Sequence, residues 1–251
     1  MKKWIYLVVL IFSSQIQALA QSDMKTNQGF LFVPHVAYNV AGGDLKNRFQ
    51  NFASIGLGVD YKFKNNIILA LDYDWFFGDN VKDLGIFSNI GGPSGTIIDE
   101  NGDFAVIQLN MKGNYATGNI GYLINLPKHE PNTGLLLSVG AGIMQHRIDI
   151  VSSQVTIPQV NNGYEEGYDQ LTYGFSTKQY VGYQYLTEKN KYHFRVGIEF
   201  NQGFTQGRRT WDYNANKSGL QKRFDSTIAF KMGLVVPVFT KKSEDEEFFI
   251  D

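Results

Sequence analysis

Cysteine is absent from this chain of 251 residues, so no disulfide bond can stabilise it. The formal net charge is only -1, so the chain lacks the basic field that nucleic-acid binding requires, and we expect no nucleic-acid partner. Charged residues make up 19%, below the ~25% of ordinary soluble domains. After the N-terminal region, no segment has 18 consecutive apolar residues, which excludes a transmembrane helix there.

The first residues have the pattern of a secretory signal peptide, expected over residues 1–20. A short basic start precedes an apolar run over residues 4–12, and Ala18 and Ala20 form a small-x-small cleavage site. A membrane anchor helix is the alternative, but spanning a bilayer takes about 20 apolar residues. We therefore expect an exported protein, and no cysteine follows the site to carry a lipoprotein anchor.

Glycine (26), phenylalanine (19) and tyrosine (14) are plentiful, which indicates strands and turns. Apolar and polar residues alternate with period two, so each strand has one apolar and one polar or small face. This pattern predicts eight strands, over residues 30–40, 53–63, 69–77, 106–124, 135–148, 178–186, 192–204 and 227–238. The phase of the fourth slips near residues 115–118, which predicts a β-bulge or a break between membrane-embedded and exposed parts.

The predicted connections alternate between short and long. Short ones are residues 64–66, 125–132 and 187–191; the others are residues 41–51, 78–105, 151–176 and 205–225. Short turns at one end and long loops at the other are typical of outer-membrane barrels. The fold class we expect is all-β, an eight-stranded antiparallel transmembrane β-barrel with long extracellular loops. A soluble lipocalin-like barrel, with its apolar residues facing inward, is the alternative.

The polar faces are rich in glycine and carry charges of both signs, which suits a crowded lumen rather than a solvated surface. We predict a plugged lumen with a polar network of Asp60, Lys62, Asp72, Asp74, His193, Arg195, Glu199 and Lys231. Aromatic residues at the ends of the apolar faces resemble the girdles at membrane interfaces.

The segment Lys231–Val238 resembles the final-strand insertion signal of outer-membrane proteins, with valine where aromatic residues are usual. The mature chain as a whole resembles the OmpA/OmpX-type family of small barrels. Its Tyr-, Asn- and Gly-rich strands and residues 205–211 resemble small outer-membrane barrels of Bacteroidota. That broad group includes accessory subunits of the type IX secretion and gliding apparatus. The resemblance implies location in the cell outer membrane.

Candidate catalytic or metal-binding groups are few. Of the histidines, His129 falls in a predicted turn, while His35, His146 and His193 have the inward parity, where a polar network is commoner than a metal site. Ser138 and His146 lie eight residues apart on one strand, about 26 Å, beyond hydrogen-bond reach. We predict no catalytic residue, no metal and no cofactor.

Two segments are candidates for partner contact. One contains Arg208, Arg209, Trp211 and Tyr213, residue types enriched at binding hot spots. The alternative is that these arginines pair with lipopolysaccharide phosphates or nearby acids and that the tryptophan extends the aromatic girdle. The other is the acidic tail, residues 241–251, which contains Phe248 and Phe249. The alternative is that this tail is a solvated end that binds nothing.

The predicted organisation is a signal peptide over residues 1–20, an outer-membrane barrel over residues 21–240 and an acidic periplasmic tail over residues 241–251. We predict a non-enzymatic structural or accessory subunit of an outer-membrane complex that acts through loop or tail contacts. Its partners would be outer-membrane lipid, including lipopolysaccharide, and other outer-membrane or periplasmic proteins. A lipid-modifying enzyme and a small channel are the alternatives.

Overall fold

The computed structural model describes residues 28–79, 81–82, 85–91, 97–126, 130–152, 156–158, 160, 163–187 and 191–239. The expected signal peptide and the tail with Phe248 and Phe249 lie outside this part of the chain. Eight long strands dominate: β1 (Gly29–Gly43), β2 (Phe52–Lys62), β3 (Ile67–Gly78), β4 (Ile107–Asn125), β5 (Gly134–Ser152), β6 (Thr172–Tyr185), β7 (Phe194–Gly207) and β10 (Lys222–Leu234).

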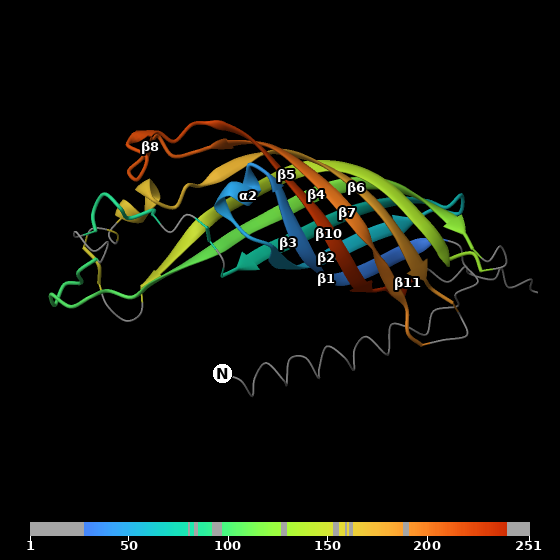
Figure 1. Cartoon of the computed structure of the whole chain (residues 1–251). Helices are drawn as coiled ribbons and strands as arrows, with labels where there is room; N and C mark the ends of the chain where they lie inside the picture. The colour runs from blue at the N-terminus through green and yellow to red at the C-terminus, as the bar shows by residue number, and fades with distance from the viewer. Residues whose placement is uncertain are drawn as a thin grey trace, which may run out of the picture.

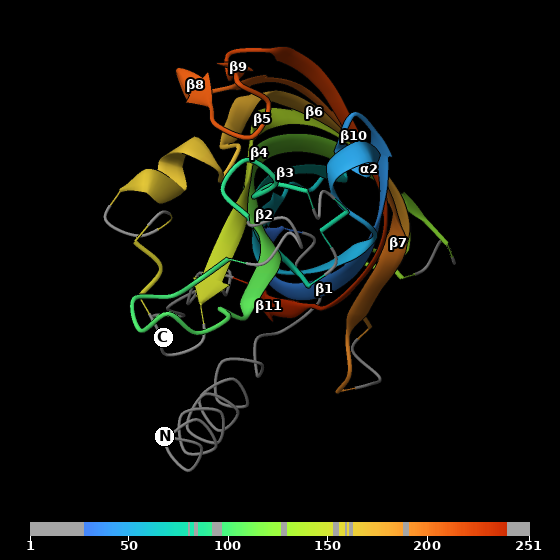
Figure 2. The same cartoon turned by 60° about the vertical axis from the view of Figure 1, so that its left-hand side comes forward.

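The strands form a closed antiparallel barrel. Their order is β10-β7-β6-β5-β4-β3-β2-β1, and β10 also pairs with β1, which closes the ring seen in Figure 2. The short β11 (Val236–Val238) continues β10 after an interruption at Val235 and pairs with the start of β1. Counted as one strand with β10, it makes the total eight, so the predicted fold class is confirmed.

The two ends of the barrel differ. At the short-turn end, strands are joined through residues 63–66, 126–133 and 186–193. At the long-loop end lie α2 (Leu45–Arg48), the 3-10 turn η1 (Tyr164–Gly167) and the hairpin of β8 (Trp211–Asp212) and β9 (Lys217–Ser218). Figure 1 shows α2 and β8 at one end and β11 at the other. None of the helices in the described segments is long and apolar enough to cross a bilayer.

The barrel is apolar outside and polar inside. In β7, Val196, Ile198 and Phe200 point outward and are exposed, while Glu199 and Asn201 point inward and are buried. Large apolar residues also point outward on the other strands, and Leu71 is 69% exposed. The lipocalin-like alternative required the opposite arrangement and is wrong.

Of the two explanations offered for the phase slip in the fourth strand, the structure shows a change between two parts of the strand and no β-bulge. The pairing of β4 with β3 and β5 is continuous over Ile107–Asn125, and odd-numbered residues face inward throughout. The character of the two faces changes along the strand. Toward the short-turn end the outward residues are apolar, as at Ile120 and Tyr122. Toward the long-loop end the outward Lys112 is polar, and the apolar Met111 is buried inside. The apparent phase slip therefore marks the border between an apolar outer belt and a section beyond it whose apolar side faces inward.

The strands also extend farther toward the long-loop end than predicted. β5 continues to Ser152, β6 begins at Thr172 rather than residue 178, and β10 begins at Lys222. The predicted loops over residues 151–176 and 205–225 are correspondingly too long. Hydrophobic alternation ends where the apolar belt ends, although backbone pairing continues, so the pattern underestimates strand length.

Apolar clusters fill the interior on both sides of its polar middle. At the long-loop end, loop residues such as Ile86, Ile157 and Val160 pack with Phe76 and Met111 of the strands. We call this folded long-loop end the cap. At the short-turn end, a second cluster is completed by residues near the chain's last strand. It consists of Leu31, Val33, Leu186, Val235 and Phe239.

Candidate functional site

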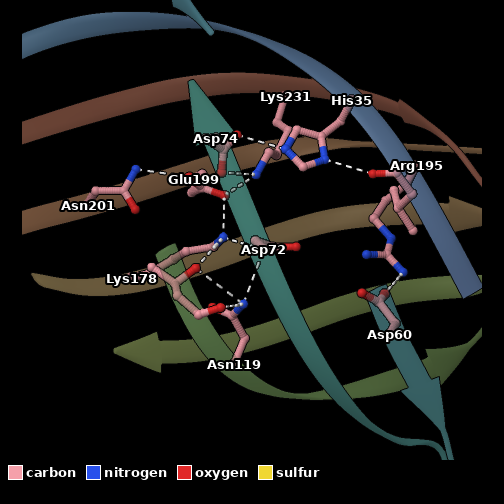
Figure 3. A network of polar contacts seen from close by, with 12 residues as sticks. His35, Asp60, Asp72, Asp74, Asn119, Lys178, Arg195, Glu199, Asn201 and Lys231 are labelled. Carbon is pink, nitrogen blue, oxygen red and sulfur yellow. Dashed lines mark hydrogen bonds and ion pairs between the residues drawn. The ribbon is translucent and has the colours of Figure 1, made fainter. Parts of the chain in front are cut away.

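Two buried lysines organise the middle of the lumen. Lys231 Nζ lies 3.0 Å from Glu199 Oε2 on the adjacent strand and 3.4 Å from Asp74 Oδ2 across the interior. Lys178 Nζ lies 3.2 Å from the same Glu199 oxygen and forms a closer ion pair with Asp72. Figure 3 shows these side chains, from β3, β6, β7 and β10, converging on one another. The Glu199 carboxylate of β7 thus pairs with lysines of both neighbouring strands, β6 and β10, and these lysines reach the aspartates of β3 across the lumen.

Further polar side chains extend this network. Arg195 Nη2 lies 2.6 Å from Asp60 Oδ2, and the same nitrogen donates to Gln184 Oε1 at 2.6 Å. Asn119 Nδ2 donates to Asp72 Oδ2 at 3.1 Å. Every one of these groups is held by a strand, which fixes its place better than a loop does.

His35 joins the network through Asp74. Its Nε2 lies 2.7 Å from Asp74 Oδ1, and its Nδ1 lies 2.9 Å from the carbonyl oxygen of Val33. His35 therefore links the Asp74 carboxylate on β3 to the backbone of its own strand β1.

Inward glycines make room for this network. A Cβ atom at Gly56 would collide with the His35 ring and the Asp74 carboxylate, and one at Gly58 would collide with Asp72. The glycine-rich inner face noted in the sequence therefore has a steric cause. The remaining space in the network is a cavity of about 40 Å³. It has room for a few water molecules, since one needs about 10–15 Å³.

Not every residue predicted for the network belongs to its centre. The structure brings together Asp60, Asp72, Asp74, Arg195, Glu199 and Lys231. Lys62 is buried two residues beyond Asp60, and His193 is buried just before β7, both at the short-turn end. Sequence reasoning placed His35 at the inward parity without counting it in the network, and it missed Lys178 and Asn119, although both have the inward parity of their strands.

A second buried cluster lies below the cap. His146 Nε2 lies 2.9 Å from Asp225 Oδ2, and Thr205 Oγ1 donates to the same oxygen at 2.6 Å. Arg223 Nη2 lies 3.3 Å from the other carboxylate oxygen. Phe49 packs edge-on against the His146 ring, with centroids 5.6 Å apart, so this cluster meets the apolar core of the cap directly. Within the described segments, no group of three His, Asp or Glu side chains is arranged to hold a metal ion.

Of the four candidate contact residues in the loop after β7, two bind within the cap. Arg209 Nη2 lies 2.6 Å from Asp169 Oδ2, and Nη1 lies 2.9 Å from Glu166 Oε2. Its hydrogen bonds to Asp169 hold the pKa of the Arg209 guanidinium above its usual range. The Tyr213 ring packs against Tyr168, with centroids 5.4 Å apart. These contacts join the loop after β7 to the loop before β6.

The other two face outward. Arg208 lies over the Tyr173 ring, 4.9 Å from its centroid, and Trp211 is 46% exposed. The cap also exposes apolar side chains outside these four candidates. Phe104 is 75% exposed, and Ile98, which pairs with it in an isolated β-bridge, is about half exposed.

Comparisons with known proteins return structures only. No protein-family model matches the chain, and no curated protein matches it in sequence. Ail, the attachment invasion locus protein of Yersinia pestis, in complex with the heparin analogue sucrose octasulfate, is 10% identical with a TM-score of 0.42, covering 84% of this chain and 99% of that chain. Neisserial surface protein A is 14% identical, with a TM-score of 0.42 and coverage of 84% and 97%. The N-terminal β-barrel domain of Pseudomonas aeruginosa OprF is 13% identical, with a TM-score of 0.37 and coverage of 83% and 98%.

Proposed function

We propose that this chain is an outer-membrane β-barrel with its long-loop end outside the cell and its short-turn end in the periplasm. We further propose that it is a non-enzymatic structural or accessory subunit of an outer-membrane protein complex, which it contacts through the cap. The apolar belt, the filled interior and the exposed residues of the cap support this proposal.

Two aromatic girdles border the belt. At the short-turn end, Phe30 and Tyr61 pack with ring centroids 4.9 Å apart, and Tyr185 and Phe194 stack at 5.2 Å. At the long-loop end, pairs such as Tyr73–Trp75 and Phe204–Phe224 pack at 4.5 and 5.6 Å. Rings of this kind mark the two membrane interfaces of outer-membrane barrels.

The spacing of the girdles suits a bilayer. On β7, Phe194 belongs to one girdle and Phe204 to the other, ten residues farther along. At about 3.3 Å per residue this separation is about 33 Å along the strand. A strand tilt of about 40° reduces it to about 25 Å across the membrane, the height of the apolar band in such barrels.

The filled interior favours a structural role over a channel. Eight strands leave a lumen just wide enough for side chains. Here buried ion pairs occupy the middle of the lumen, and apolar clusters lie on either side of them. A water-filled passage would require both clusters to move.

Exposed apolar residues of the cap carry the proposal of a partner. Phe104 is 75% exposed and Val106 is 72% exposed, at the end of the barrel beyond the girdle. A folded surface with such residues suits contact with another protein. Arg208, beside Tyr173 of the outer girdle, is suited to contact a lipopolysaccharide phosphate. A role in type IX secretion stays a prediction that rests only on the resemblance of the Tyr-, Asn- and Gly-rich strands to small barrels of Bacteroidota.

A capture experiment tests this function. We would compare the intact protein with a Phe104→Ala/Trp211→Ala variant, using Glu165→Ala, an exposed cap residue, as the matched control. We expect a specific co-purifying outer-membrane protein to be lost from the double variant and kept by the control. If all three capture the same set, or the intact barrel purifies alone, the subunit proposal is wrong.

A further inference from the structure

Three polar side chains that contact one another lie on the outer face of the barrel, where large apolar residues bracket them along their strands. Thr177 and Gln179 belong to β6, and Gln202 belongs to β7. The outward parity of both strands places them on the surface, and each is partly exposed. We call these three residues the amide patch.

The amide patch lies inside the belt and not beyond its edge. On β6 it is bracketed by Phe175 and Val181, which are 54% and 52% exposed. On β7, Gln202 is bracketed by Phe200 and Phe204, which are 38% and 56% exposed. Lipid-exposed polar groups are costly in hydrocarbon, and in membrane proteins they commonly mark functional surfaces.

The hydrogen bonds within the amide patch leave one donor and one acceptor unused. Gln202 Oε1 accepts from Thr177 Oγ1 at 2.5 Å and from Gln179 Nε2 at 3.3 Å. The Gln202 amide nitrogen and the Gln179 amide oxygen have no partner among the described side chains and backbone. Hydrocarbon provides no hydrogen-bonding groups, so a polar partner in the membrane would satisfy these two groups.

We propose that this partner is a second copy of the chain. A free donor and a free acceptor on one small surface are self-complementary under a two-fold rotation, because the Gln202 nitrogen of each copy can donate to the Gln179 oxygen of the other. Both copies insert in the same direction, so the axis runs along the membrane normal. Such an isologous contact is the commonest arrangement in homo-oligomers.

The surfaces beside the amide patch agree with this symmetry. On one side, across β3 to β6, lies an outer groove of about 450 Å³ lined by residues including Ile120, Leu137 and Val139. On the other side, β10 presents Ile228 and Phe230, which are 45% and 55% exposed. A two-fold axis through the amide patch places the β10 ridge of each copy opposite the groove of the other.

Disulfide trapping tests the proposal, because the chain has no native cysteine. Phe200→Cys places a thiol directly across from Gln179. Leu71→Cys is the matched control, since Leu71 is 69% exposed on β3, four strands away on the opposite wall. In liposomes under mild oxidation, we expect covalent dimers at least tenfold faster from Phe200→Cys than from Leu71→Cys.

A second substitution assigns the contact to the amide patch. Adding Gln202→Leu to Phe200→Cys should slow dimer formation about tenfold, because two reciprocal hydrogen bonds are lost. Adding Ile198→Leu, an apolar exchange on the same face, should not. Equal rates at residues 200 and 71, or no effect of Gln202→Leu, would each overturn the proposal. The dimer proposal rests on the proposed function, because it requires a barrel inserted in lipid. Heat-modifiable gel mobility tests each variant for a folded barrel, so a failure to fold is distinguished from a failure to dimerise.

Discussion

Removing the Lys231 ammonium group tests the lumen network most sharply. In a Lys231→Met variant the side chain keeps its length, while Glu199 and Asp74 each lose an ion-pair partner at 3.0 and 3.4 Å. The three side chains are 10%, 4% and 4% exposed, so solvent screens the loss only weakly. The network would then carry one positive charge fewer.

The expected loss of unfolding free energy follows from this burial. Breaking a buried ion pair by removing one partner costs about 3–5 kcal/mol. Glu199 keeps Lys178 at 3.2 Å and Asp74 keeps His35 at 2.7 Å, so we expect the lower end, about 3 kcal/mol. Adding Glu199→Gln restores the charge balance, so the double variant should lose less than the sum of the two single losses.

Urea unfolding in lipid vesicles, followed by tryptophan fluorescence, measures these differences. Lys222→Met, an exposed lysine on the same strand, is the control, with an expected change below about 0.5 kcal/mol. A loss below about 1 kcal/mol for Lys231→Met, the range of exposed pairs, would refute the idea of a buried network. Strict additivity in the double variant would refute the coupling.

The remaining predictions concern the belt, the inner face and the cap. Phe230→Arg puts a charge on the outer face of β10 opposite Ile198, midway between the girdles, where Phe230 is 55% exposed, and should cost about 2–4 kcal/mol; urea unfolding should show this loss, whereas Leu234→Arg, opposite Phe194 of the short-turn girdle, should cost only about 0–1 kcal/mol. Gly56→Ala forces a methyl group against His35 and Asp74 and should cost about 1–3 kcal/mol in the same assay, whereas a neutral result would mean that the network yields easily. Asp169→Asn removes the charge that holds Arg209, so limited proteolysis should cut the loop after β7 faster in this variant than in Glu165→Ala. Unchanged cleavage would show that this ion pair does not order the cap.

The alternation of apolar and polar residues predicted the barrel well, because each strand in the belt has an apolar outer face and a polar inner face. In β2, β3 and β7, one face meets an apolar surrounding and the other a polar interior, so parity alone assigns Asp60, Asp72 and Glu199 inward. The same signal failed where the surroundings change. Beyond the belt the outer face of β4 becomes polar and its inner face packs into the cap, which imitated a phase slip.

The sequence could not predict which charged side chains pair with one another inside the lumen. Lys178 stands at the first residue of its predicted strand, where alternation gives least support, yet it pairs with Asp72 three strands away around the ring. That contact depends on closure of the barrel and on the narrow width of its interior, which local patterns do not encode. The cap presents the same difficulty, because the Arg209–Asp169 pair joins two loops whose relative position follows from packing.

Contact of the outer face with lipid is the central claim, and quenching by brominated lipids tests it most directly. Trp75 and Trp211 would be replaced by phenylalanine, and a single reporter introduced by Ile198→Trp in the belt or by Tyr164→Trp in the cap. Both original side chains are half exposed, at 50% and 54%. In vesicles of brominated lipid we expect strong quenching of the reporter at residue 198 and little at residue 164. Equal, weak quenching at the two positions would mean that the apolar belt does not lie in the membrane.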